Sequence, residues 1–169
     1  MSNINIAYYK KNGVECILGS YDNKLCLIDS LNRKNKTTLY NRLKKQLKAE
    51  FIEYEDEVLK QTIQELDEYF KGERKVFTIP LLLIGSAFQK SVWEALLQIP
   101  YGTTSSYKEQ AKMINNEKAV RAVANANGAN AIGIIVPCHR IIRSDGKLTG
   151  YAGGLEMKEQ LLALEKQNK

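Results

Sequence analysis

The stretch "SYKEQAKMINNEKAVRAVANANG", residues 106–128, contains two short helix-forming segments separated by a turn. Ser106 and Glu109 match the capping box, in which a serine oxygen and a side chain three residues later satisfy free N–H groups at a helix start. The first helix is expected to run to about Ile114, and the second to end at the final glycine. Two short helices joined by a tight turn predict a helix-turn-helix, although similar helical hairpins also occur in proteins that never bind DNA.

The residues before this stretch predict another helix and a domain boundary. Ser86 and Gln89 form a second capping-box pattern, so the boundary falls near Gly85. Pro100 ends the helix. The apolar residues at helical spacing behind the cap are Phe88, Val92, Trp93, Leu96 and Leu97.

The N-terminal half predicts a small sheet with helices. The turn Asn12-Gly13 separates two runs of alternating apolar residues, which indicates a hairpin, and "LCLIDSL" adds a third strand. Segments 40–50 and 57–73 have helical spacing, and "KVFTIPLLLI" returns to an extended pattern. We therefore expect an α+β protein. It has an N-terminal scaffold domain, residues 1–85, built from a small antiparallel sheet with helices, and a mainly helical C-terminal domain, residues 86–169, that carries the helix-turn-helix.

Composition narrows the class of protein further. The chain has 169 residues, of which 44% are hydrophobic, enough to bury a core. Its net charge of +6 suits a polyanionic partner but equally serves solubility. The apolar runs are too short to span a bilayer and the first residues lack a signal-peptide pattern, so we expect a cytosolic protein without a membrane partner. Three scattered cysteines and one histidine predict neither a disulfide framework nor a zinc cluster.

The second helix of the predicted pair has small side chains on one face. Ala119, Ala122 and position 126 are expected to share this face, with Arg121 at its edge and Val120 on the opposite side. Small side chains would let the helix backbone approach another surface closely. The alternative is that the alanines are good helix formers and Arg121 is a solvated charge.

The run "IIVPCHRII", residues 134–142, contains the only histidine of the chain. A cysteine in an apolar run is usually a small buried hydrophobic residue. A nucleophilic cysteine, however, must ionise, and it needs a base or a nearby positive charge. His139 and Arg140 offer both to Cys138.

The base needs a suitable geometry. Adjacent residues of an extended segment point to opposite sides, so His139 requires a bridging water or a sharp turn to reach the thiol, and Pro137 favours a turn. A histidine base also needs an acceptor that orients it, and Glu165 in the C-terminal helical segment is the acidic candidate.

The segments "VPCHR", "GYAGG", "SYKEQA" and "AVRAVANANGAN" together closely resemble the O6-alkylguanine-DNA alkyltransferase family, also called methylated-DNA–protein-cysteine methyltransferases. The resemblance covers residues 86–169 almost continuously. It implies DNA repair by direct reversal, in which an alkyl group passes irreversibly and once per molecule from O6-alkylguanine, and as a second candidate O4-alkylthymine, to Cys138. It further implies a monomer that binds flipped-out bases of double-stranded DNA through the minor groove, with no cofactor and no metal.

The resemblance also implies roles for catalytic residues. Cys138 matches the alkyl acceptor, His139 the histidine that deprotonates it through a water, and Glu165 the glutamate that holds this histidine. Asn130 matches the asparagine that fixes the turn over the site. Tyr107 matches the tyrosine that helps to rotate the damaged nucleotide and contacts the base.

Further matches concern DNA and the substrate pocket. Arg121 matches the arginine that fills the vacated place in the base stack, and the face of Ala119 and Ala122 would lie in the minor groove. Tyr107 and Arg140 complete the expected DNA-binding residues. The expected pocket residues are Val136, Tyr151, Ala152 and Gly153.

Some positions depart from the family pattern. Ala152 replaces a hydroxyl residue, Ala124 replaces a glycine, and Gly133 replaces a proline found in some members. The missing proline predicts a less enclosed pocket and weak reaction with benzylated guanine.

Three other functions would require different features of the chain. A damage-binding relative without repair activity would lack the cysteine. A cysteine hydrolase or thiol oxidoreductase would turn over repeatedly or use a second thiol, but the sequence has no CxxC motif. A structural helix-turn-helix protein would be indifferent to loss of Cys138.

Overall fold

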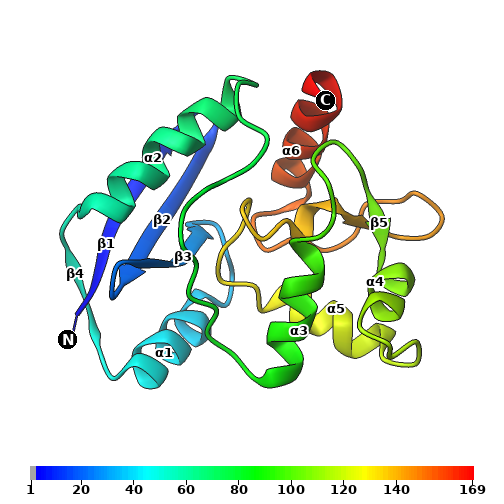
Figure 1. The fold of residues 1–169 in the computed structure, drawn as a ribbon, viewed down its shortest axis with the longest axis horizontal. Coiled ribbons are helices and arrows are strands. Elements are labelled where there is room, and N and C mark those ends of the chain that lie inside the picture. The colour runs from blue at the N-terminus through cyan, green and yellow to red at the C-terminus, as the bar shows by residue number, and fades with distance from the viewer. Residues whose placement is uncertain (1–2) are drawn as a thin grey trace.

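The computed structural model describes residues 3–169, and the N-terminal half forms the predicted meander (Figure 1). Strands β1 (Asn3–Lys11), β2 (Val14–Tyr21) and β3 (Lys24–Ser30) pair antiparallel. Asn12 and Gly13 have φ angles of 57° and 80°, which suit a tight hairpin turn. Residues 1–2, with which the predicted N-terminal domain begins, lie outside the described residues.

The sheet is mixed rather than purely antiparallel. A fourth strand, β4 (Glu50–Glu53), pairs parallel to β1 and gives the order β3-β2-β1-β4. The predicted return to an extended strand in residues 75–84 is wrong in part. This segment contributes an isolated bridge between Leu81 and Leu25, and Leu82 N–H donates to the Leu25 carbonyl over 2.8 Å.

Two helices accompany the sheet. Helix α1 (Lys36–Leu47) begins four residues before the predicted segment, and α2 (Glu57–Phe70) agrees with its amphipathic pattern. Asp56 caps α2, because its carboxylate accepts the Leu59 backbone N–H over 2.9 Å. The predicted boundary near Gly85 lies in the connection between α2 and the helices of the C-terminal half.

The C-terminal half is mainly helical, as predicted. Its elements are α3 (Ala87–Leu96), β5 (Ser105–Ser106), α4 (Tyr107–Met113), α5 (Val120–Gly128), a 3₁₀ helix η1 (Cys138–Arg140), β6 (Ile141–Ile142) and α6 (Leu155–Asn168). Ser86 and Gln89 form the complete capping box at α3, and the Ser106 oxygen accepts the Glu109 N–H over 3.0 Å at α4. Helices α4 and α5 form the predicted helical pair, with α5 starting later than the sequence pattern indicated.

The two halves share one hydrophobic core. Ile28 of β3 donates its N–H to the Ala131 carbonyl over 2.8 Å, and its own carbonyl accepts the Gly133 N–H over 2.9 Å. The sheet therefore supports the segment that leads into Cys138. Within residues 3–169, no helix is long and apolar enough to cross a membrane.

Candidate active site

Cys138 begins a single 3₁₀ turn after Pro137. The backbone before it is tightly bent, since Ile134 has a φ of 70°, a region that β-branched residues rarely adopt. Ile134 is buried, and a hydrogen bond of 3.0 Å from Val136 N–H to the Ile132 carbonyl closes the bend. The turn that Pro137 suggested is thus present. It places Cys138 at a pocket and His139 in the buried interior.

Asn130 connects this bend to the thiol. Its Nδ2 donates to the Val136 carbonyl over 2.8 Å and lies 3.3 Å from Cys138 Sγ, while its Oδ1 accepts the Ile132 N–H over 2.9 Å. Burial raises the pKa of the Cys138 thiol, whereas the hydrogen bond from Asn130 lowers it. The thiol is therefore protonated at rest and needs a base to ionise.

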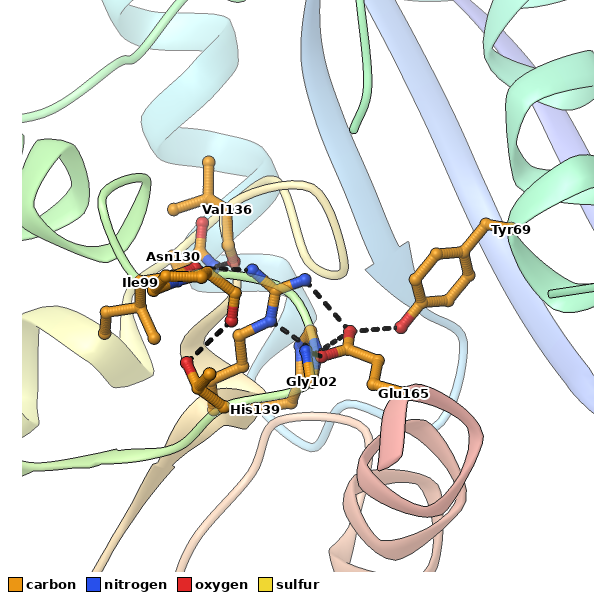
Figure 2. Close-up of polar contacts among 10 residues, drawn as sticks. Tyr69, Ile99, Gly102, Asn130, Val136, His139 and Glu165 are labelled. Atoms are coloured by element: carbon orange, nitrogen blue, oxygen red, sulfur yellow. Dashed lines mark hydrogen bonds and ion pairs between the residues drawn. The ribbon is translucent and has the colours of Figure 1, made fainter. Parts of the chain in front are cut away.

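His139 is completely buried and lies 2.7 Å, through Nε2, from Oε2 of Glu165 (Figure 2). An ionised carboxylate only accepts, so this contact places the proton on Nε2 and leaves a lone pair on Nδ1. Nδ1 is buried and has no hydrogen-bond partner among residues 3–169. Burial lowers the pKa of His139, although Glu165 raises it, and the neutral imidazole is ready to accept a proton.

Glu165 is held by several donors. Burial alone would raise its pKa, but hydrogen bonds from His139, Arg140 and Tyr69 lower the pKa of Glu165 to about 2. Arg140 donates from Nε to Oε1 over 2.8 Å, and Tyr69 Oη lies 2.6 Å from Oε2. Gly102 N–H completes the set at 3.3 Å from Oε1. The carboxylate thus stays ionised and fixed in orientation.

The structure corrects the expectation that Arg140 binds DNA. Its side chain is buried, and it donates to Glu165 and, over 2.7 Å, to the Ile99 carbonyl. The guanidinium is occupied inside the protein because Glu165 needs a buried counter-charge. Arg140 therefore orients the carboxylate instead of contacting phosphate.

Cys138 lies in a pocket formed by both halves of the chain. The residues after α5 and the loop before α6 supply Asn130, Gly133, Tyr151, Ala152 and Gly153, and β3 adds Asp29 and Ser30. Val136, predicted as a pocket residue, is fully buried, and its carbonyl accepts the Asn130 amide. Its side chain does not line the pocket, and its carbonyl helps to hold the turn.

A wider groove leads from this pocket to the helical pair. Cys138, Tyr151 and Gly153 line both cavities, and Tyr107 and Gly128 line the groove. Tyr107 begins α4, and its Oη lies 3.0 Å from Thr149 Oγ1. The predicted base-contacting tyrosine therefore borders the path from surface to thiol.

The exposed face of α5 differs in part from the predicted one. Arg121 and Ala122 are exposed, as expected, and Ala119 is half-buried at the N-cap position. Position 126 is buried, and Val120 is exposed, contrary to the prediction. Val123, Ala126 and Asn127 face the core, so α5 is rotated about its axis relative to the predicted orientation.

Two family models cover most of the chain. Residues 13–83 match "6-O-methylguanine DNA methyltransferase, ribonuclease-like domain", and residues 87–167 match "6-O-methylguanine DNA methyltransferase, DNA binding domain".

The chain belongs to the 6-O-methylguanine DNA methyltransferase family.

Curated relatives share its sequence over most of their length. The chain is 46% identical to the methylated-DNA–protein-cysteine methyltransferase of Methanosarcina mazei, over 83% of this chain and 88% of that protein. It is 47% identical to the inducible methyltransferase of Bacillus subtilis, over 76% of this chain and 72% of that protein.

Solved structures share its fold. A Mycobacterium tuberculosis OGT in complex with DNA has a TM-score of 0.82 and 37% identity, and the match covers 98% of this chain and 94% of that chain. The O6-methylguanine-DNA methyltransferase of Pyrococcus kodakaraensis has a TM-score of 0.65 and 25% identity, with 96% and 98% covered. The resemblance and the α+β fold class expected from the sequence are thus confirmed.

This family member has buried polar residues near the site that sequence reasoning missed. Lys158 is fully buried, and its Nζ donates to the Thr149 carbonyl over 2.9 Å, next to the contact between Thr149 and Tyr107. Lys158 shares one face of α6 with Leu161 and Glu165, so its spacing could have indicated an inward position. Tyr69 shares the buried face of α2 with Leu59 and Leu66, so its inward position had the same kind of signal, but only the folded chain brings its hydroxyl to Glu165.

Proposed function

We propose that this methyltransferase-family protein repairs O6-alkylguanine in double-stranded DNA by a single irreversible transfer of the alkyl group to Cys138. The observation that carries the proposal is the Cys138 pocket. It contains the thiol, it opens into the groove beside the helical pair, and the residue next to Cys138 is a buried histidine oriented by Glu165. The family membership, and the name of the relatives, agree with this chemistry.

The chemical step follows from the relay of side chains. His139 Nδ1 takes the thiol proton through a water molecule, and Glu165 stabilises the resulting imidazolium. The thiolate attacks the alkyl carbon, so a C–S bond forms as the C–O6 bond breaks. The electron pair passes to guanine, which takes up one proton at N1 from solvent, and His139 returns its proton to solvent. The Tyr107 hydroxyl donates a hydrogen bond to the departing base. The product is a thioether with no side chain positioned to cleave it, so each molecule acts once.

DNA binding uses the exposed face of α5. A base inside a duplex cannot reach a thiol in a pocket, so the damaged nucleotide must flip out, at a cost of a few kcal/mol. Arg121 fills the vacated place in the stack, and the small Ala122 and Ala119 let the helix enter the minor groove. Tyr151, Ala152 and Gly153 form the wall that closes over the flipped base.

The protein acts as a monomer in the cytosol, with residues 1–85 as a scaffold domain and residues 86–169 as the DNA-binding and alkyl-acceptor domain. The hydrogen bonds between β3 and residues 131–133 support a scaffolding role for the first domain.

The decisive experiment is intact-mass spectrometry with peptide mapping after mixing the protein with excess duplex that carries one O6-methylguanine. We expect one methyl group per chain, located on Cys138, with an equal amount of restored guanine. Cys138→Ser should bind the duplex without gaining mass. The matched control is Cys16→Ala with Cys26→Ala, because both thiols are buried in strands and burial raises the pKa of each to about 12.

Other outcomes point to the competing functions. Many restored guanines per chain would indicate a hydrolase or oxidoreductase, and tight binding by wild type with no mass change would indicate a damage sensor. Either result would refute the proposal.

A further inference from the structure

The N-terminal half contributes a hydrogen bond to the catalytic carboxylate. Tyr69 lies in α2, 96 positions before Glu165, and its hydroxyl lies 2.6 Å from Oε2. The same oxygen lies 2.7 Å from His139 Nε2, and Figure 2 shows both contacts on one carboxylate. Tyr69 is fully buried, and burial and Glu165 both raise the pKa of its phenol far above the ordinary value. The hydroxyl is therefore protonated and acts as a donor.

We propose that Tyr69 is a positioning residue of the alkyl-transfer relay, which shares Oε2 of Glu165 with His139 and so keeps the imidazole neutral before reaction. The inference rests on the proposed function and deepens it. It adds a residue from the N-terminal half to a relay whose other members all come from the C-terminal half.

The physical reason is competition for the charge of one oxygen atom. A buried carboxylate that faced His139 alone would strongly favour the imidazolium, since Coulomb interactions are strong where water is excluded. A histidine protonated at rest could not accept the Cys138 proton. Each further donor on Oε2 withdraws part of that charge, so Nδ1 remains free as a base.

Other charged or titratable groups also face the pair. Arg140, on the same turn as His139, and Lys158, on α6, both oppose protonation of His139. Arg140 also donates from Nη2 to Oε2 over 3.1 Å. Tyr69 differs from these cations because it changes the hydrogen bonding of Glu165 without adding charge.

Tyr101 provides a matched control. Its ring centroid lies 6.2 Å from that of Tyr69, and its buried hydroxyl has no hydrogen-bond partner within residues 3–169. Tyr101→Phe therefore removes a phenol oxygen from the same region without removing a donor to Glu165.

The test uses the fact that His139 is the only histidine of the chain. Nitrogen NMR of the full-length protein reports its tautomer and titration directly. In wild type and in Tyr101→Phe, we expect a neutral ring with the proton on Nε2. In Tyr69→Phe, we expect the titration midpoint to rise by about one pH unit, the scale of one hydrogen bond to a charged group.

Methyl transfer from an O6-methylguanine duplex gives the second readout. In Tyr69→Phe, the acidic limb of the pH–rate profile should shift to higher pH by the same amount as the NMR midpoint. The plateau rate at higher pH should stay within about threefold of the wild-type rate. Site-specific 3-fluorotyrosine at position 69, a stronger donor that preserves packing, should move the midpoint downward. If Tyr69→Phe does not fold, the 3-fluorotyrosine variant still tests the inference.

An unchanged histidine titration in Tyr69→Phe, or a fall in rate that is equal at every pH, would overturn the inference and leave Tyr69 a packing residue. A 3-fluorotyrosine variant without a downward shift would also overturn it. If wild type transfers no methyl group, the proposed function fails, but the NMR titration still decides whether Tyr69 controls His139.

Discussion

Burial and hydrogen bonding act on the Cys138 thiol in opposite directions. Burial raises the thiol pKa, and the Asn130 amide, 3.3 Å from Sγ, is the side chain that donates to it. The same amide holds the Val136 carbonyl, so one residue both shapes the turn and assists ionisation. This double role explains why an asparagine, which offers a donor and an acceptor together, suits position 130.

Asn130→Ala should therefore raise the pKa of Cys138 and slow alkyl transfer by about tenfold, the effect of losing one hydrogen bond to a charged group. The pH dependence of Cys138 alkylation by iodoacetamide measures this shift without DNA. Asn125→Ala, on the exposed face of α5, is the control and should react as wild type does. An identical pH midpoint in Asn130→Ala would contradict the role in ionisation.

At the scale of elements, α4 and α5 are joined by a reciprocal pair of buried amides. Gln110 Nε2 donates to Asn127 Oδ1 and Asn127 Nδ2 donates to Gln110 Oε1, each over 2.7 Å. The pair turns Asn127 toward the core and leaves Arg121, Ala122 and Asn125 on the outer face of α5. The orientation of the proposed DNA-binding face thus depends on contacts between helices.

Ala122→Leu should weaken binding to an O6-methylguanine duplex by about tenfold or more, because a large side chain on this face holds the helix away from the groove floor. Fluorescence anisotropy with a labelled duplex measures the affinity. Ala122→Ser, which stays small, should bind nearly as wild type does. The iodoacetamide reaction of Cys138 should be equal in both variants, and equal DNA affinity in both would argue against a minor-groove role for this face.

At the scale of the whole molecule, two arginines of the N-terminal half hold the end of α5. Arg33 donates to the carbonyls of Gly128 and Asn130 over 3.1 and 3.0 Å, and Arg42 donates to the Ala129 carbonyl over 2.8 Å. Cations at a helix C-terminus are favourable because its carbonyl groups are unpaired there. The scaffold thereby fixes the segment from which Asn130 reaches the thiol.

Arg42→Ala should lower the free energy of unfolding by about 1–3 kcal/mol and slow methyl transfer, because the Ala129 carbonyl loses its donor. Chemical denaturation and single-turnover kinetics measure the two effects. Lys45→Ala, an exposed position on the same helix, is the control. Unchanged transfer by a destabilised Arg42→Ala would show that the arginine supports the fold alone.

Two buried groups should make the folded protein less stable as pH falls. Burial lowers the pKa of His139 from 6.5, so below about pH 6.5 the unfolded chain gains a proton that the folded chain does not. Glu165 has its pKa lowered from 4.5 to about 2, so its stabilising contribution is present above pH 4.5 and is lost toward pH 2. Unfolding free energies measured across this range should decrease in both steps.

Glu165→Gln should flatten the step between about pH 4.5 and pH 2, whereas Glu159→Gln, exposed on the same helix, should leave it intact. A step of equal size in Glu165→Gln would mean that other carboxylates cause the acid sensitivity.

The sequence by itself determined the meander, the amphipathic helices, their caps and the reactive motif. These features depend on local chemistry: Asn12-Gly13 suits a tight turn, Ser86 caps the helix that follows it, and Pro137 bends the chain before Cys138. The mixed sheet was not predicted, because the parallel pairing of β4 with β1 joins segments that have no local signal for each other.

Only the tertiary structure decided how the site is assembled. It turned Arg140 inward to Glu165, rotated α5 so that position 126 is buried, and brought Tyr69 to a carboxylate 96 positions away. Buried polar groups must find partners, and those partners come from whichever segments the packed core places beside them. Residue spacing along the chain does not contain that information.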